Sequence, residues 1–307
     1  MNAIDKPWPA PYSRYMALSR IPRQTQAILL MLGAILCFSL MDVLAKVLTQ
    51  NTGLGQTLWA RYAGQCLIVL MLIGHRKDVW KAQFPLLQIG RSVMLLAATG
   101  FFFSGIAAVG LALATALMNV NPVLITLGGA LLLRERLGPW RAVGIVSSLA
   151  GAIIIIRPGA QVFTPAILLP LGGAICYAGY SLATRFVGQR ESVWTSLLYT
   201  GLVGGLLTSV ALPFLWQPLS PGDFAMMIGI GAVGTLGQLA LIQAFSKAEA
   251  GAIAPFAYAS LIFASVWGML FFGTYPDGWT IAGSLIIALS GIFVWHRETR
   301  RNKASTT

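Results

Sequence analysis

The chain has 307 residues, of which 57% are hydrophobic and only 10% are charged. A soluble protein needs more charged residues than this to cover its surface, so the composition excludes an ordinary soluble domain. The formal net charge of +12 would suit nucleic-acid binding in a soluble chain. Here the basic residues lie between long apolar runs, which indicates a protein of the lipid bilayer with no nucleic-acid partner.

The apolar runs predict an all-α integral membrane protein. They recur at close to the ~20 residues that a helix needs to cross a bilayer, and the 33 glycines favour packed helices over a barrel. Residues 1–25 hold four prolines and no apolar core, so they are predicted to be a cytoplasmic tail, not a signal peptide. Ten spans are predicted at 26–48, 56–74, 91–110, 112–133, 139–157, 165–185, 194–215, 223–245, 250–272 and 278–296.

The first span returns later in the chain as an internal repeat. Residues 27–50 match residues 166–189 at an offset of 139, with eight of 24 positions identical. The same offset places Trp140 on Trp279. A repeat of this length indicates one structural unit used twice, here residues 26–157 and 165–296, followed by a basic tail at 297–307.

The basic residues between the spans fall on one side of the predicted membrane. The connections after spans 1, 3, 5, 7 and 9 hold only Arg157, whereas the tails and the other connections hold 18, counting Arg91 at a loop edge. Because Lys and Arg favour cytoplasmic loops, both termini are predicted to lie in the cytoplasm. Five spans per repeat is an odd number, so the second repeat should be inverted relative to the first, as in many secondary transporters.

Three motifs add to the duplication: residues 119–122 (Asn-Val-Asn-Pro), residues 133–137 (Leu-Arg-Glu-Arg-Leu) and residues 254–258 (Ala-Pro-Phe-Ala-Tyr). With them the chain resembles the ten-span EamA-type members of the drug/metabolite transporter superfamily from about residue 26 to 296. The resemblance implies a carrier of small polar solutes in the cytoplasmic (inner) membrane. The acidic residue that such repeats often carry after the fourth helix is Glu135, and the second repeat has Thr274 in its place.

Charged residues within the predicted spans are few. Asp42 and Lys46 share a face of span 1, and Arg61 lies in span 2. Charges in a bilayer face protein or water and find partners. One interpretation is a charged vestibule that attracts an anionic or zwitterionic solute, in which Asp42 could also carry a proton. The other is a structural Asp42–Arg61 clamp, with Lys46 extending to the outer surface.

Uncharged polar side chains predict a substrate site near the membrane midplane. Pro122 has no backbone N–H, so a backbone carbonyl within span 4 lacks its usual hydrogen-bond donor. Asparagine side chains precede Pro122, and their amides either join helices or line a cavity. Tyr258 is the repeat equivalent of Asn119. The glycines of span 8 are interpreted mainly as sites of close helix approach. The predicted substrate-binding residues are Asn119, Asn121, Tyr177, Tyr180, Gln238 and Tyr258.

No motif of an enzyme, a nucleotide-binding loop or a metal site is present, and the three cysteines lie within apolar runs. We therefore expect no cofactor. The prediction is a secondary transporter of a small polar metabolite, amino acid-like or related, working by alternating access with or without proton coupling through Asp42 or Glu135. The alternatives are a multidrug or toxic-metabolite exporter and a membrane sensor or scaffold that does not transport.

Overall fold

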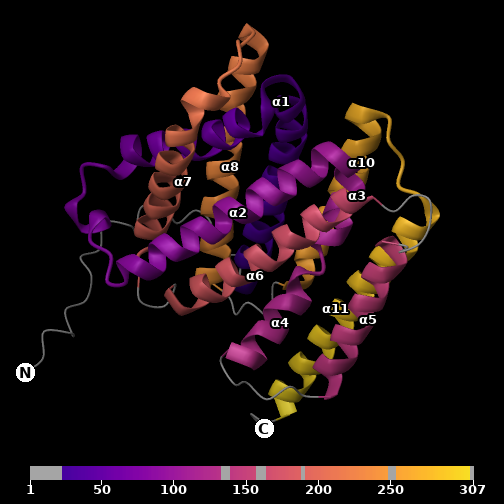
Figure 1. The fold of residues 1–307 in the computed structure, drawn as a ribbon. Helices are drawn as coiled ribbons and strands as arrows, with labels where there is room; N and C mark the ends of the chain where they lie inside the picture. The colour runs from indigo at the N-terminus through magenta and orange to yellow at the C-terminus, as the bar shows by residue number, and fades with distance from the viewer. Residues whose placement is uncertain (1–22, 133–138, 157–163, 188–190, 248–253, 305–307) are drawn as a thin grey trace, which may run out of the picture.

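The computed structural model describes residues 23–132, 139–156, 164–187, 191–247 and 254–304 (Figure 1), and within these ranges all regular structure is helical. This confirms the predicted all-α class. The α-helices are α1 (Arg23–Ile73), α2 (Pro85–Val109), α3 (Leu111–Met118), α4 (Asn121–Leu132), α5 (Pro139–Ile156), α6 (Leu168–Val187), α7 (Val193–Leu215), α8 (Pro221–Lys247), α10 (Ala259–Phe272) and α11 (Gly278–Ala304). Short 3-10 turns are η2 (Lys77–Trp80), η3 (Pro165–Ile167) and η4 (Ala254–Tyr258).

The connection expected between spans 1 and 2 is almost entirely helical. Helix α1 runs through it, and Gly53 alone departs from helical geometry, with φ 81° and ψ 165°. A residue with a side chain would be strained at this positive φ, so glycine lets the chain change direction within one residue. The prediction of a loop at residues 49–55 was therefore wrong, although the two apolar halves of α1 remain distinct.

Span 4 is interrupted, and the described part of span 9 begins with a 3-10 turn. The helix of span 4 stops at Met118 and restarts at Asn121, so Pro122 falls in the first turn of α4, where its missing N–H costs little. In the second repeat the 3-10 turn η4 contains Pro255 and leads directly into α10. The break expected near Pro122 is thus present, and it has an irregular counterpart at the equivalent place.

Several helices have the length and surface of membrane spans. Within the described ranges, five are long and apolar enough to cross a bilayer, and four further apolar helices of 10–17 residues accompany them. Large apolar side chains lie on the outside, among them Phe214 at 87% exposure and Leu86 at 83%. Such surface is unfavourable in water and favourable against lipid, which fits a multi-pass membrane protein.

The helices pack in matched pairs from the two repeats. Helix α1 packs along α8 and α7, α2 packs along α6, and α5 lies beside α11 (Figure 1). Gly64 of α1 and Gly231 of α8 meet so closely that a Cβ added to Gly64 would lie 2.9 Å from the Gly231 Cα. This close approach agrees with the interpretation of the span 8 glycines.

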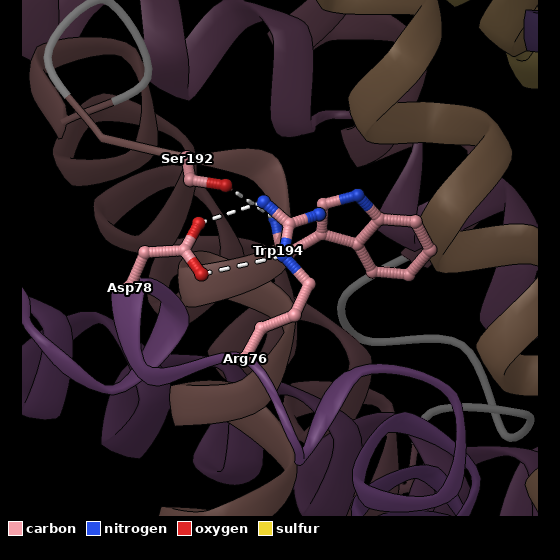
Figure 2. Close-up of polar contacts among 4 residues, drawn as sticks. All are labelled: Arg76, Asp78, Ser192 and Trp194. Atoms are coloured by element: carbon pink, nitrogen blue, oxygen red, sulfur yellow. Dashed lines mark hydrogen bonds and ion pairs between the residues drawn. The ribbon is translucent and has the colours of Figure 1, made fainter. Parts of the chain in front are cut away.

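The connection between α1 and α2 lies against the start of α7. Val79 of η2 packs with Val69, Leu197 and Leu198. Figure 2 shows the polar contacts here: Arg76 donates to Asp78 at 2.7 Å, and the Ser192 hydroxyl caps α7 by accepting from the Trp194 N–H at 3.2 Å. The hydrogen bond from Arg76 lowers the pKa of the exposed Asp78 carboxyl.

Some predicted features lie outside the described residues, namely Glu135, Arg157 and nearly all of the N-terminal tail. At the other end, α11 continues to Ala304, so the basic tail predicted at 297–307 is helical for most of its length.

Candidate functional site

The first group of polar side chains inside the molecule contains two tyrosines of α6. The Tyr177 and Tyr180 rings lie 5.5 Å apart, and the Tyr180 hydroxyl accepts a hydrogen bond of 2.7 Å from Gln238 Nε2. Tyr180 and Gln238 are 3% and 2% exposed. Tyr177 and Tyr180 share a face of α6 because they are three residues apart. The hydrogen bond from Gln238 of α8 brings a third predicted site residue to the same place.

Arg91 of α2 approaches the same tyrosine pair from the other side. Its guanidinium carbon is 5.3 Å from the centre of the Tyr180 ring, and the residue is 1% exposed. Its nitrogens donate to the Ser196 carbonyl at 2.7 Å and to the hydroxyls of Thr200 and Thr184 at 3.1 and 3.2 Å. Arg91 was counted among the loop charges, and that interpretation was wrong, because α2 begins six residues earlier than predicted.

Asp42 and Arg61 lie inside the helical bundle, at 9% and 5% exposure. Their charges are near enough to interact, but no ion pair joins them in the described part of the chain. Arg61 Nη1 instead donates to the thioether sulfur of Met41 at 3.1 Å, and its guanidinium carbon is 5.1 Å from the centre of the Tyr62 ring. Lys46 faces a different neighbour, with its Nζ 3.7 Å from the centre of the Phe272 ring.

A second polar group forms where the break in span 4 meets the start of α10. Asn119, the C-cap of α3, donates from Nδ2 to the Thr115 carbonyl at 2.7 Å and to the Ser260 hydroxyl of α10 at 3.1 Å. Tyr258 caps the start of α10 and packs among apolar side chains such as Leu117 and Ile287. The repeat equivalents Asn119 and Tyr258 are thus both buried beside this junction.

Asn121 opens α4 and is only partly buried, yet its Oδ1 is buried without a hydrogen-bond partner. A buried acceptor left unbonded is costly and needs an explanation. A solute donor at this point would satisfy it, which keeps Asn121 among the predicted binding residues.

The predicted residues therefore form two groups of contacts, where a single site near the midplane was predicted. Tyr177, Tyr180 and Gln238 gather between α6 and α8, while Asn119, Asn121 and Tyr258 follow the junction of α3, α4 and α10. Sequence reasoning missed the polar neighbours Arg91, Tyr62 and Ser260. Tyr62 is fully buried and its hydroxyl bonds to Thr99 of α2 at 2.8 Å. Its place directly after Arg61 in an apolar run was the available signal.

Among the residues that the structure describes, no three His, Cys, Asp or Glu side chains gather closely enough to hold a metal ion. The central polar groups are phenols, amides and guanidinium groups. These bind and release solutes through hydrogen bonds and charge, which suits recognition rather than covalent chemistry.

A helix interrupted beside Asn119 and a 3-10 turn at the equivalent place of the second repeat lie within a repeated bundle of apolar helices. This arrangement is typical of membrane carriers. The model of the EamA-like transporter family matches this chain twice, over residues 25–157 and 164–295. The chain therefore belongs to the EamA-like transporter family, as the resemblance indicated.

Individual relatives cover nearly the full chain. A riboflavin transporter of Vibrio cholerae is 30% identical over 287 residues, 91% of this chain and 95% of its own. A pseudopaline exporter of Pseudomonas aeruginosa is 29% identical, covering 86% and 94%. An S-adenosylmethionine uptake transporter of Rickettsia bellii is 23% identical, covering 84% and 89%. One solved crystal structure superimposes with a TM-score of 0.65 at 19% identity, covering 88% of this chain and 96% of its own, which shows the fold alone.

Proposed function

We propose that this protein is a secondary transporter of a small polar metabolite in the cytoplasmic membrane. The relatives named above carry riboflavin, pseudopaline and S-adenosylmethionine by name, and their common property is a small polar solute. They include an exporter and an uptake transporter, so the family allows transport in either direction.

The proposed topology has ten spans in two inverted repeats with both termini cytoplasmic. The long helix α1 supplies two spans, because Gly53 separates two apolar halves. Helices α2, α6, α7 and α8 supply four, and the shorter apolar helices, including the interrupted span 4, supply the other four. An odd number of spans per repeat makes the second repeat enter the membrane in the opposite sense.

The observation that carries the proposal is the hydrogen bond between Asn119 and Ser260. It joins the break between α3 and α4 to the first turn of α10, two places that are equivalent in the repeats. Carriers built from repeats bind solute where interrupted helices from both halves meet near the midplane. Tyr177, Tyr180 and Gln238 on one side and Asn119, Asn121 and Tyr258 on the other are the proposed binding residues.

Counterflow in proteoliposomes tests the proposal. The purified protein is reconstituted with 2 mM unlabelled solute inside, and a trace of the same labelled solute is added outside. The panel contains riboflavin, S-adenosylmethionine, the common amino acids and, as a large apolar cation, tetraphenylphosphonium. We expect transient accumulation of at least one label above protein-free vesicles. Binding without accumulation would indicate a sensor or scaffold, and exchange restricted to large apolar cations would indicate a multidrug exporter.

A further inference from the structure

Asp42 and Arg61 are buried charges that have no bonded charge partner in the described part of the chain. The hydrogen bond observed for Arg61 goes to the Met41 sulfur, which is a weak acceptor. The Arg61 Nε is buried and has no partner among the described residues. Asp42 is 9% exposed and accepts no hydrogen bond from the described residues. Charged groups inside a membrane protein are costly unless something neutralises them.

The two charges are close, yet they do not neutralise each other directly. In the part of the chain that the structure describes, the ion pair that does form is Arg76–Asp78, in an exposed connection where pairing gains little. Lys46, four residues after Asp42, is held over the Phe272 ring. A purely structural clamp would bring Asp42 and Arg61 into contact, because pairing is worth more in the interior than at the surface.

Arg61 is also held in place, as a binding group must be. Met41 and the Tyr62 ring contact its guanidinium, and Tyr62 is fixed in turn by its hydrogen bonds to Thr99 and to the Leu95 carbonyl of α2. Gly234 of α8 provides room, since a Cβ there would lie 3.1 Å from the Met41 sulfur. A positioned guanidinium with free N–H groups is suited to a carboxylate, which it can bind through two parallel hydrogen bonds.

We propose that Asp42 and Arg61 are the two halves of a site for a zwitterionic headgroup, with the solute's ammonium at Asp42 and its carboxylate at Arg61. This inference rests on the proposed transport function and names its substrate class: small solutes that carry an aminocarboxylate group. One such headgroup satisfies both buried charges and adds no net charge to the site. Tyr177, which is near enough to Arg61 for electrostatic interaction, then faces the remainder of the solute together with its neighbour Tyr180.

The test uses counterflow with trios of matched probes. Each trio contains an α-amino acid, its decarboxylated amine and its deaminated acid, for example methionine, 3-(methylthio)propylamine and 4-(methylthio)butanoate. The twenty common amino acids and S-adenosylmethionine are screened first, and the trio is built on the best of them. We expect at least one aminocarboxylate to be exchanged, and each truncated analogue to compete at least tenfold more weakly.

Single variants then assign the two halves. Arg61→Gln should remove the preference for the amino acid over its amine, and Asp42→Asn should remove the preference over its acid. Arg76→Gln and Asp78→Asn remove the same charges from the exposed connection and should leave both preferences intact. A clamp without a binding role would lower the stability of the Asp42 and Arg61 variants but would leave the ratios among the three probes unchanged.

Conservative variants cover a failure to fold. If Asp42→Asn or Arg61→Gln does not yield folded protein, Asp42→Glu and Arg61→Lys are assayed, and each should weaken competition by the amino acid more than by the analogue that lacks the group it binds. Wild-type ratios in folded Asp42 and Arg61 variants overturn the inference. Exchange of riboflavin with no exchange of any aminocarboxylate also overturns it while the transport function stands. Exchange of no probe at all contradicts both.

Discussion

Gln238 of α8 donates a hydrogen bond of 2.7 Å to the Tyr180 hydroxyl of α6, inside a site where neither residue is more than 3% exposed. This contact joins α6, the first long helix of the second repeat, to α8, the third. Arg91 of α2 covers the Tyr180 ring, so the first repeat takes part as well. Tyr180 is therefore a shared contact of three helices.

Tyr180→Phe removes the acceptor and leaves the buried Gln238 amide unpaired, which should lower stability by about 1–3 kcal/mol. The double variant Tyr180→Phe with Gln238→Leu should recover part of the loss, because replacing both partners by apolar groups is less costly. Tyr177→Phe is the control, since its hydroxyl makes no hydrogen bond among the described residues. Thermal unfolding in detergent compares the wild type, the control, the double variant and both single variants, Tyr180→Phe and Gln238→Leu. An additive double variant would contradict the pairing.

Substitutions at Asn119 and Tyr258 should separate effects on folding stability from effects on solute binding. The Asn119 amide already bonds to Ser260 and to the Thr115 carbonyl, so Asn119→Ala should lower the melting temperature. The Tyr258 hydroxyl makes no hydrogen bond among the described residues, so Tyr258→Phe should melt as the wild type does. If that hydroxyl binds solute, Tyr258→Phe should weaken affinity by roughly threefold to tenfold, the effect of about 0.5–1.5 kcal/mol. Unchanged affinity by titration calorimetry would remove Tyr258 from the site.

The contact between α1 and α8 should tolerate no side chain at Gly231. A Cβ there would lie 3.0 Å from the Gly64 Cα and 3.1 Å from the Ala60 carbonyl oxygen, and backbone atoms cannot move aside as a side chain does. Gly231→Ala should cost about 1–3 kcal/mol. Gly33→Ala in α1 is the matched control, because no atom lies within 4 Å of its added Cβ. Equal unfolding midpoints for the two variants would contradict the close approach.

The family, the helical class and the break near Pro122 were predictable because each depends on local pattern: apolar length, repeat offset or a missing N–H. The burial of Arg91 was not predictable, since its acceptors Ser196 and Thr200 are more than a hundred residues away in the sequence. The continuation of α1 through residues 49–55 was missed because polar residues there, such as Asn51 and Thr52, look like a loop. The polar residue that follows this segment is Gln56. Gln56 is fully buried and bonds to the backbone of Gln217 in both directions.

The proposed ten-span topology predicts opposite accessibility for two exposed positions. Lys77 lies in the connection between α1 and α2, and Gln50 lies near the Gly53 bend. Single cysteines at these positions, in a background that lacks Cys37, Cys66 and Cys176, are labelled in intact cells with an impermeant maleimide. We expect labelling of Gln50→Cys only, and labelling of Lys77→Cys after the cells are opened. Equal labelling of both in intact cells would contradict the topology.

Arg91 should behave as a buried joint between helices and not as a loop charge. Its guanidinium reaches α7 through Ser196 and Thr200 and α6 through Thr184, so one planar group ties three helices together. The single nitrogen of lysine cannot make these diverging contacts. Arg91→Lys should therefore lower stability by about 1.5–3 kcal/mol, the cost of losing one hydrogen bond from a charged group or more. Arg76→Gln, in the exposed connection, should melt as the wild type does. If Arg91→Lys also melts as the wild type does, the charge alone is sufficient at this position and the guanidinium contacts do not hold α2 to α6 and α7.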